Sequence, residues 1–146
     1  MKTSEEIISR MMELKDQDYH CSRIMAVLGL ERSGGSSPDL VRAMAGLEAG
    51  CGFTRETCGI LTGASALIGW HAGKGRDGEA DSDKLLPMLQ ELGEWFRKEA
   101  EGRFPSTRCR DIAGDKMGTP EGMQICGSLL FRTFSKLDGI LTAYGL

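Results

Sequence analysis

Apolar residues recur every three or four positions along most of this chain, the spacing that predicts amphipathic helices. The first helix follows a capping residue at Thr3 or Ser4, and a second begins near Cys21. Their predicted inner positions are Ile7, Ile8, Met11, Met12 and Leu14 in the first helix, and Cys21, Ile24, Met25 and Leu28 in the second. No segment alternates with period two, so the pattern predicts an all-α, compact single-domain bundle of about six or seven helices.

Glycine-bearing polar segments separate the later helices. Residues 31–37 and 74–82 are predicted to be internal loops of the single domain 1–146. The helix after the first loop has Ser37 as its N-cap and Pro38 as its first residue. The helix after the second loop has the inner positions Leu85, Leu89, Leu92 and Phe96.

Two further helices complete the chain. Ser106 or Thr107 is predicted to cap a short helix that contains Cys109. Thr119 and Pro120 are then the cap and first residue of a long last helix. Its predicted inner positions are Met123, Cys126, Leu130, Phe134, Leu137, Leu141 and Tyr144.

The stretch from Gly50 to Gly73 changes character at Cys58. The residues before it are charged and broken by glycine, and the residues after it are apolar and mostly small. We predict that Thr57 caps a helix beginning at about Cys58. Gly59 and Gly63 lie four apart on one face of that helix, where they let a neighbouring helix or a cofactor approach the backbone; helix packing is the commoner reason.

Charge and length exclude several classes of function. The chain has 146 residues, a formal charge of −3 and a pI near 5.4, which give no electrostatic reason to bind nucleic acid. The N-terminal segment lacks the pattern of a signal peptide, so we expect a cytoplasmic protein. The longest apolar run, Cys58 to Trp70, is shorter than the roughly 20 residues that span a bilayer, and we expect no membrane insertion.

The chain contains 5 cysteines, an odd number that argues against a secreted disulfide framework. No two of them form a CxxC pair, so spacing alone is a weak signal for a metal or redox site and favours buried thiols that act as small hydrophobes. The two histidines, His20 and His71, are predicted to be surface or rim residues. A dyad of Cys58 with His71 is unfavourable because about 20 Å of helix would separate them.

The thiols fall into two physical types. Cys58 and Cys109 are predicted at helix N-termini, where the helix dipole and neighbouring cations would favour the thiolate. These cations are Arg55 beside Cys58, and Arg108 and Arg110 beside Cys109. Cys21 and Cys126 lie on apolar stripes, where burial would raise the thiol pKa.

The segment RETCGILTGASALIG, residues 55–69, resembles the GETCGAxTGA-type core of the redox-active protein family named for its C-GCAxxG-C-C cysteine pattern. The likeness rests on Thr57, Cys58, Gly59, Thr62, Gly63 and Ala64, and Cys21, Cys109 and Cys126 fall where the other three family cysteines are expected. The resemblance implies redox-active cysteines and supplies no reaction. Ile60, Cys51 and the pair Thr54-Arg55 depart from the family pattern, and Cys51 is an unassigned fifth thiol.

The leading hypothesis is a redox protein in which Cys21, Cys58, Cys109 and Cys126 converge at one end of the bundle and bind a metal centre. An iron-sulfur cluster used in electron transfer or redox sensing is the favoured cofactor. One alternative is metal-free thiol-disulfide chemistry, with Cys58 or Cys109 as the attacking thiolate. Another is a structural or interaction module with zinc-bound or inert cysteines. A redox partner protein is expected, the glycine-lined faces allow a homodimer, and no pattern assigns an enzymatic reaction.

Overall fold

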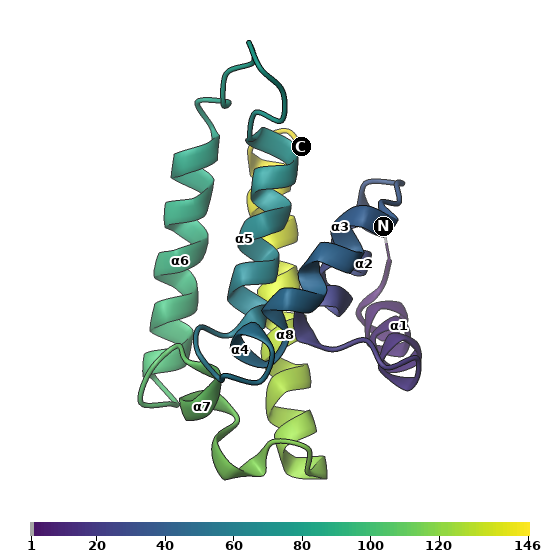
Figure 1. Cartoon of the computed structure of the whole chain (residues 1–146), viewed down its shortest axis with the longest axis vertical. Helices are drawn as coiled ribbons and strands as arrows, with labels where there is room; N and C mark the ends of the chain where they lie inside the picture. The colour runs from purple at the N-terminus through teal and green to yellow at the C-terminus, as the bar shows by residue number, and fades with distance from the viewer. Residues whose placement is uncertain (1) are drawn as a thin grey trace.

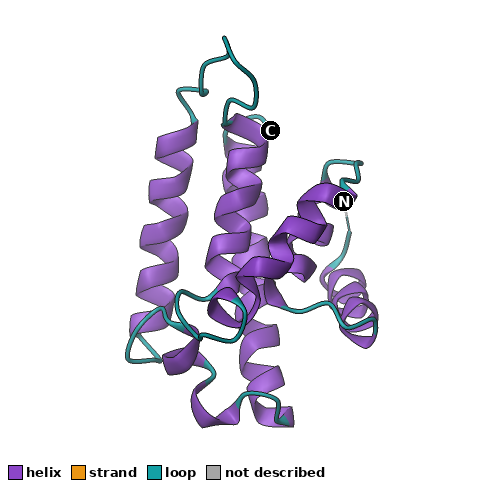
Figure 2. Cartoon of the chain, in the orientation of Figure 1, coloured by secondary structure: helices purple, strands orange, loops and turns teal. Residues whose placement is uncertain are grey.

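The computed structural model describes residues 2–146, which form helices joined by loops and turns (Figures 1 and 2). The elements are α1 (Ser4–Asp16), α2 (Cys21–Arg32), α3 (Pro38–Met44), the 3-10 helix η1 (Ala45–Leu47), α4 (Glu48–Cys51), α5 (Gly59–Ala72), α6 (Leu85–Glu101), α7 (Cys109–Ile112), the 3-10 helix η2 (Gly114–Lys116) and α8 (Pro120–Ala143). Between residues 2 and 146 there is no β-strand, only one isolated antiparallel bridge between Thr57 and Arg108. The prediction of an all-α fold is confirmed.

Three of the predicted helix caps are present. The Thr3 hydroxyl accepts a hydrogen bond from Glu6 N–H, and the Glu6 carboxylate accepts one from Thr3 N–H, which completes a capping box. Ser37 caps α3 and Thr119 caps α8 through their side-chain oxygens, each with proline as the next residue. Local sequence signals therefore determine where these helices begin.

Two predicted caps are wrong, and the bridge between Thr57 and Arg108 explains both errors. The N-cap of α5 is Cys58 rather than Thr57, and the N-cap of α7 is Arg108 rather than Ser106 or Thr107. Pairing keeps Thr57 and Arg108 extended, so each helix starts one to two residues after the position that the capping signals indicated.

Helix α5 lies at the centre of the bundle and packs against α2, α6 and α8 (Figure 1). The largest fully buried side chains are Leu14, Met25, Met44, Ile60, Leu67, Ile68, Met88, Leu92, Phe96, Leu137, Ile140 and Leu141. The first turns of α5 and α8 lie at one end of the bundle together with α4 and α7 (Figure 1). This end of the molecule carries the candidate site.

Three residues predicted to face inward are exposed instead. Ile8 and Met12 in α1 and Met123 in α8 have exposed side chains, whereas Met11 and Leu14 are buried. Helix α1 packs on α2 and α8 along one narrow side, so the second row of its apolar residues has no neighbour. Within residues 2–146, no helix has both the length and the apolar character needed to cross a bilayer.

Candidate functional site

The backbone before α5 is left-handed, and this includes residues 49–51 of α4, so α4 is not a regular right-handed helix. The five consecutive residues 49–53 all have positive φ angles, between 52° and 68°. The loop closes on itself, since Arg55 N–H donates to Ala49 O at 3.1 Å and Glu56 N–H donates to Gly50 O at 3.0 Å. Only glycine fits at position 50, because a Cβ there would lie 2.4 Å from the Glu56 nitrogen. This closure fixes the backbone of Arg55 and Glu56 in front of α7.

The bridge between Thr57 and Arg108 then aligns two cysteines. Cys109 N–H donates to Glu56 O at 2.7 Å, and Cys58 N–H donates to Thr107 O at 3.0 Å. Successive residues of extended segments point to opposite faces. Thr57 and Arg108 are exposed, while Cys58 and Cys109, each the next residue, are both buried. Two cysteines far apart in sequence therefore share one face of the bridge.

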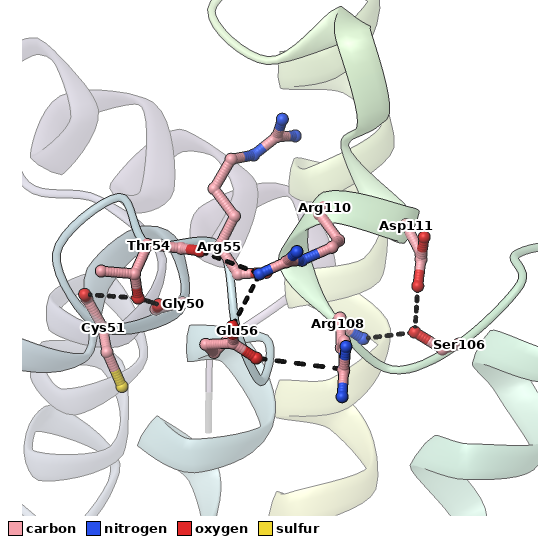
Figure 3. Close-up of polar contacts among 9 residues, drawn as sticks. All are labelled: Gly50, Cys51, Thr54, Arg55, Glu56, Ser106, Arg108, Arg110 and Asp111. Carbon is pink, nitrogen blue, oxygen red and sulfur yellow. Dashed lines mark hydrogen bonds and ion pairs between the residues drawn. The ribbon is translucent and has the colours of Figure 1, made fainter.

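The arginines that flank Cys109 in sequence, Arg108 and Arg110, are exposed, and both pair with Glu56 (Figure 3). Arg110 Nη2 lies 2.6 Å from one carboxylate oxygen of Glu56, and Arg108 Nε lies 3.9 Å from the other. Arg110 also donates to the carbonyls of Thr54 and Arg55 at 3.3 Å. These contacts hold the loop to α7, and the prediction that Arg108 and Arg110 act on the Cys109 sulfur is wrong.

The glycine pair of α5 accommodates the start of α2. A Cβ on Gly59 would lie 2.6 Å from Cys21 Sγ, and a Cβ on Gly63 would lie 3.1 Å from Ser22 Cα. The buried Ser22 hydroxyl donates to Met44 O at 2.7 Å and ties α2 to α3. The absence of a side chain at Gly59 thus lets the Cys21 sulfur lie against the residue that follows Cys58.

Four of the five thiols belong to one electrostatic cluster, and all five are free. The charge of Cys21 acts on the pKa of Cys58 and of Cys126, and the charge of Cys109 acts on the pKa of Cys21 and of Cys126. Because such coupling acts between neighbouring groups, four thiols lie near one another: Cys21 and Cys109 at the starts of α2 and α7, Cys58 at the N-cap of α5 and Cys126 in the second turn of α8. Cys51 is exposed and contributes to none of these pKa values.

Residues 19–140 match the family model described as "Putative redox-active protein (C_GCAxxG_C_C)". The chain belongs to this C-GCAxxG-C-C family. The match covers most of the 146 residues and includes the four clustered cysteines, which confirms the resemblance expected from the sequence. No curated protein and no solved structure shows significant similarity to the chain.

Burial controls the acidity of the family cysteines in this chain. The pKa of Cys58 is raised to about 12, mainly by burial and to a smaller extent by the charges of Cys21 and Cys126, against the amide groups of Ile60 and Leu61. Burial also raises the pKa of Cys126 to about 11. For Cys58 the expectation of a dipole-stabilised thiolate is wrong, because loss of hydration outweighs the helix N-terminus. Cys58 makes no side-chain cap hydrogen bond of regular geometry.

Cys109 and Cys21 follow the same rule, with different polar neighbours. Burial raises the pKa of Cys109, and the guanidinium of Arg55 acts in the opposite direction by contact and by charge. The sequence had suggested Arg55 as the neighbour of Cys58. Helix α7 has only 4 residues and therefore a weak dipole, so Arg55 is the main group that favours a thiolate there. Burial raises the pKa of Cys21 too, against the amides of Ala49 and Ser22.

Four cysteine sulfurs are ligands that thiophilic metals prefer, and the Arg55 guanidinium beside Cys109 is a neighbouring cation, not a ligand. Among residues 2–146, no three His, Cys, Asp or Glu side chains surround one point at which a single metal ion could bind. His20 is exposed at the N-cap of α2, and His71 lies near the opposite end of α5, 3.3 Å from the Ser33 hydroxyl. Neither histidine belongs to the cluster of four cysteines, so the candidate ligands are the cysteine sulfurs alone.

Proposed function

We propose that this protein is a redox protein whose four clustered cysteines hold an iron-sulfur cluster for electron transfer or redox sensing. The observation that supports the proposal most is the meeting of four free thiols, from four separate helices, at one end of the bundle. Iron-sulfur clusters are held by four cysteine thiolates. Residues Cys21, Cys58, Cys109 and Cys126 would be these ligands.

The electrostatics of the site also favour a cationic occupant. Burial raises the pKa values of all four thiols, and the charges of neighbouring cysteines add to this for Cys21, Cys58 and Cys126, so four neighbouring thiolates need additional positive charge. Iron ions supply that charge when bound, and a cluster accepts and releases single electrons.

The protein contributes a fixed and dry frame. The bridge at Thr57 and Arg108 holds the backbones of Cys58 and Cys109 together, and Gly59 leaves room for the Cys21 sulfur. Cys58 belongs to the hydrophobic core and Cys21 packs against it. Such a frame limits the access of water, one of the factors that set cluster potentials.

Anaerobic purification, followed by iron and sulfide assays and an absorption spectrum, tests the proposal. We expect bound iron and sulfide in the wild-type protein and a clear loss in Cys-to-Ser variants of each of the four clustered residues. The matched control is Cys51→Ser, which changes the exposed fifth thiol and should keep full iron content. A colourless protein after attempted reconstitution, or equal losses in the control, would contradict the proposal, and bound zinc without sulfide would indicate a structural metal site.

Thiol-disulfide exchange is the second candidate, because Cys58 and Cys109 share one face of the bridge. Oxidation of the two thiols would form one S–S bond and pass two electrons and two protons to a disulfide of a partner protein. Their raised pKa values make both poor attacking groups at neutral pH. Non-reducing peptide mapping after mild oxidation separates the candidates: a single reversible Cys58–Cys109 disulfide in a metal-free protein supports exchange.

A further inference from the structure

The backbone of Arg55 is held on both sides. Its N–H donates to Ala49 O at 3.1 Å, and its carbonyl accepts the backbone N–H of Arg110 at 3.1 Å. Its φ angle is 64°, a conformation that a non-glycine residue adopts only under such constraint. The loop thus fixes the point from which the Arg55 side chain starts.

The side chain extends from that point to the Cys109 side of the thiol cluster. Its guanidinium lies beside the Cys109 thiol, and Nη2 donates to the carbonyl of Gly114. The Nε–H group is buried and has no hydrogen-bond partner among residues 2–146. An unsatisfied buried donor of this kind is unfavourable, more so when the group is charged, and needs a physical explanation.

We propose that Arg55 is a positioning residue that donates this free Nε–H group to a sulfur atom of the loaded four-cysteine site and so raises its reduction potential. The inference rests on the iron-sulfur function proposed above. Reduction adds one negative charge to the site, and a nearby cation with a hydrogen-bond donor stabilises the reduced form more than the oxidised form. Arg108 and Arg110, the arginines on either side of Cys109, pair with Glu56 at the surface. Of the three arginines, Arg55 is therefore the one whose charge is directed towards the cysteines.

The inference is tested by redox titrations of Arg55→Gln and Arg55→Lys, in which the absorption of the cluster reports its oxidation state. Potentials are compared only between samples whose iron and sulfide contents have been measured. We expect Arg55→Gln to weaken the preference for the reduced form about tenfold, equivalent to about 59 mV towards negative potential for one electron. Arg55→Lys keeps the charge without the planar fork and should fall between this variant and the wild type.

Arg108→Gln is the matched control. It removes the other arginine side chain at this bridge, which is 57% exposed, and the potential of this variant should equal that of the wild type. A loaded Arg55→Gln protein with the wild-type potential would overturn the role of Arg55. If Arg55→Gln does not fold or load, Arg55→Lys decides, and an unchanged potential there overturns the inference. A wild-type protein that binds no iron would instead overturn the proposed function, and with it this inference.

Discussion

Replacing Gly59 by alanine should disturb the candidate site directly. A Cβ at this position would lie 2.6 Å from Cys21 Sγ and 2.7 Å from the carbonyl oxygen of Leu47, well inside ordinary contact distances of 3.4–4 Å. The Leu47 oxygen belongs to the backbone and the cysteine side chain is short, so neither can move away easily. Overpacking of this kind costs about 1–3 kcal/mol. We therefore expect Gly59→Ala to lower the free energy of unfolding by about that amount.

Gly69→Ala provides the control on the same helix. No atom outside the helix backbone lies within 4 Å of a Cβ at Gly69, so the substitution meets open space. Alanine within a helix is more stable than glycine by about 0.5–1 kcal/mol, whereas at Gly59, the first residue of α5, this gain is smaller. The two substitutions should therefore change stability in opposite directions.

Urea denaturation of the reduced, metal-free variants, followed by far-ultraviolet circular dichroism, measures both effects. A second measurement, the iron content after reconstitution, should fall for Gly59→Ala and stay unchanged for Gly69→Ala, because only the former displaces the Cys21 sulfur. Equal stability changes in the two variants, or a Gly59→Ala protein as stable as the wild type, would refute the packing argument.

Three more predictions follow from burial and charge. The reduced protein should lose stability as the pH rises from about 9 towards 12, because the native state keeps a proton on Cys58, whose pKa is raised from 9.0 to about 12, while the unfolded chain releases it. Urea midpoints across this range check it, and an equally steep loss in Cys58→Ala would argue against this assignment. Iodoacetamide should alkylate the exposed Cys51 before Cys58 in the reduced protein; peptide mapping that finds the reverse order contradicts the assigned burial. Glu48→Gln should cost about 1–3 kcal/mol in denaturation experiments, since the buried carboxylate pairs with Arg23; the exposed control Asp39→Asn should cost less than about 0.5 kcal/mol, and equal losses would contradict the reasoning.

The sequence predicted the helices well because their signals are local. Thr3, Ser37 and Thr119 cap their helices through contacts within a few residues, so the chain needs no tertiary information to begin helices there. The exposure of Ile8 and Met12 depends instead on which elements pack beside α1. Periodicity identifies an apolar face and does not reveal how much of that face another helix covers.

The candidate site required long-range information. The sequence pattern divided the cysteines into those at helix starts and those on apolar stripes. Cys58 is both a helix cap and a core residue, and its burial determines the direction of its pKa shift. The contact of Arg55 with Cys109 depends on the bridge and on the left-handed loop, and neighbouring positions in the chain gave no sign of it. The sequence pattern also gave no indication of the positive φ angles of residues 49–53, which depend on hydrogen bonds from residues 55 and 56.

The strained loop is best explained by what it holds in place. Ala49, Cys51 and Phe53 adopt left-handed conformations, each of which costs about 1–2 kcal/mol for a residue with a Cβ. A connection from η1 to α5 does not need them, because ordinary turns could join two helices over this length. The conformation does, however, bring residues 55 and 56 back onto residues 49 and 50, so that one carbonyl receives the Cys109 amide and one guanidinium reaches the thiol cluster. Backbone strain concentrated beside the four thiols is the pattern expected where a site, rather than chain connection, determines the conformation of a loop.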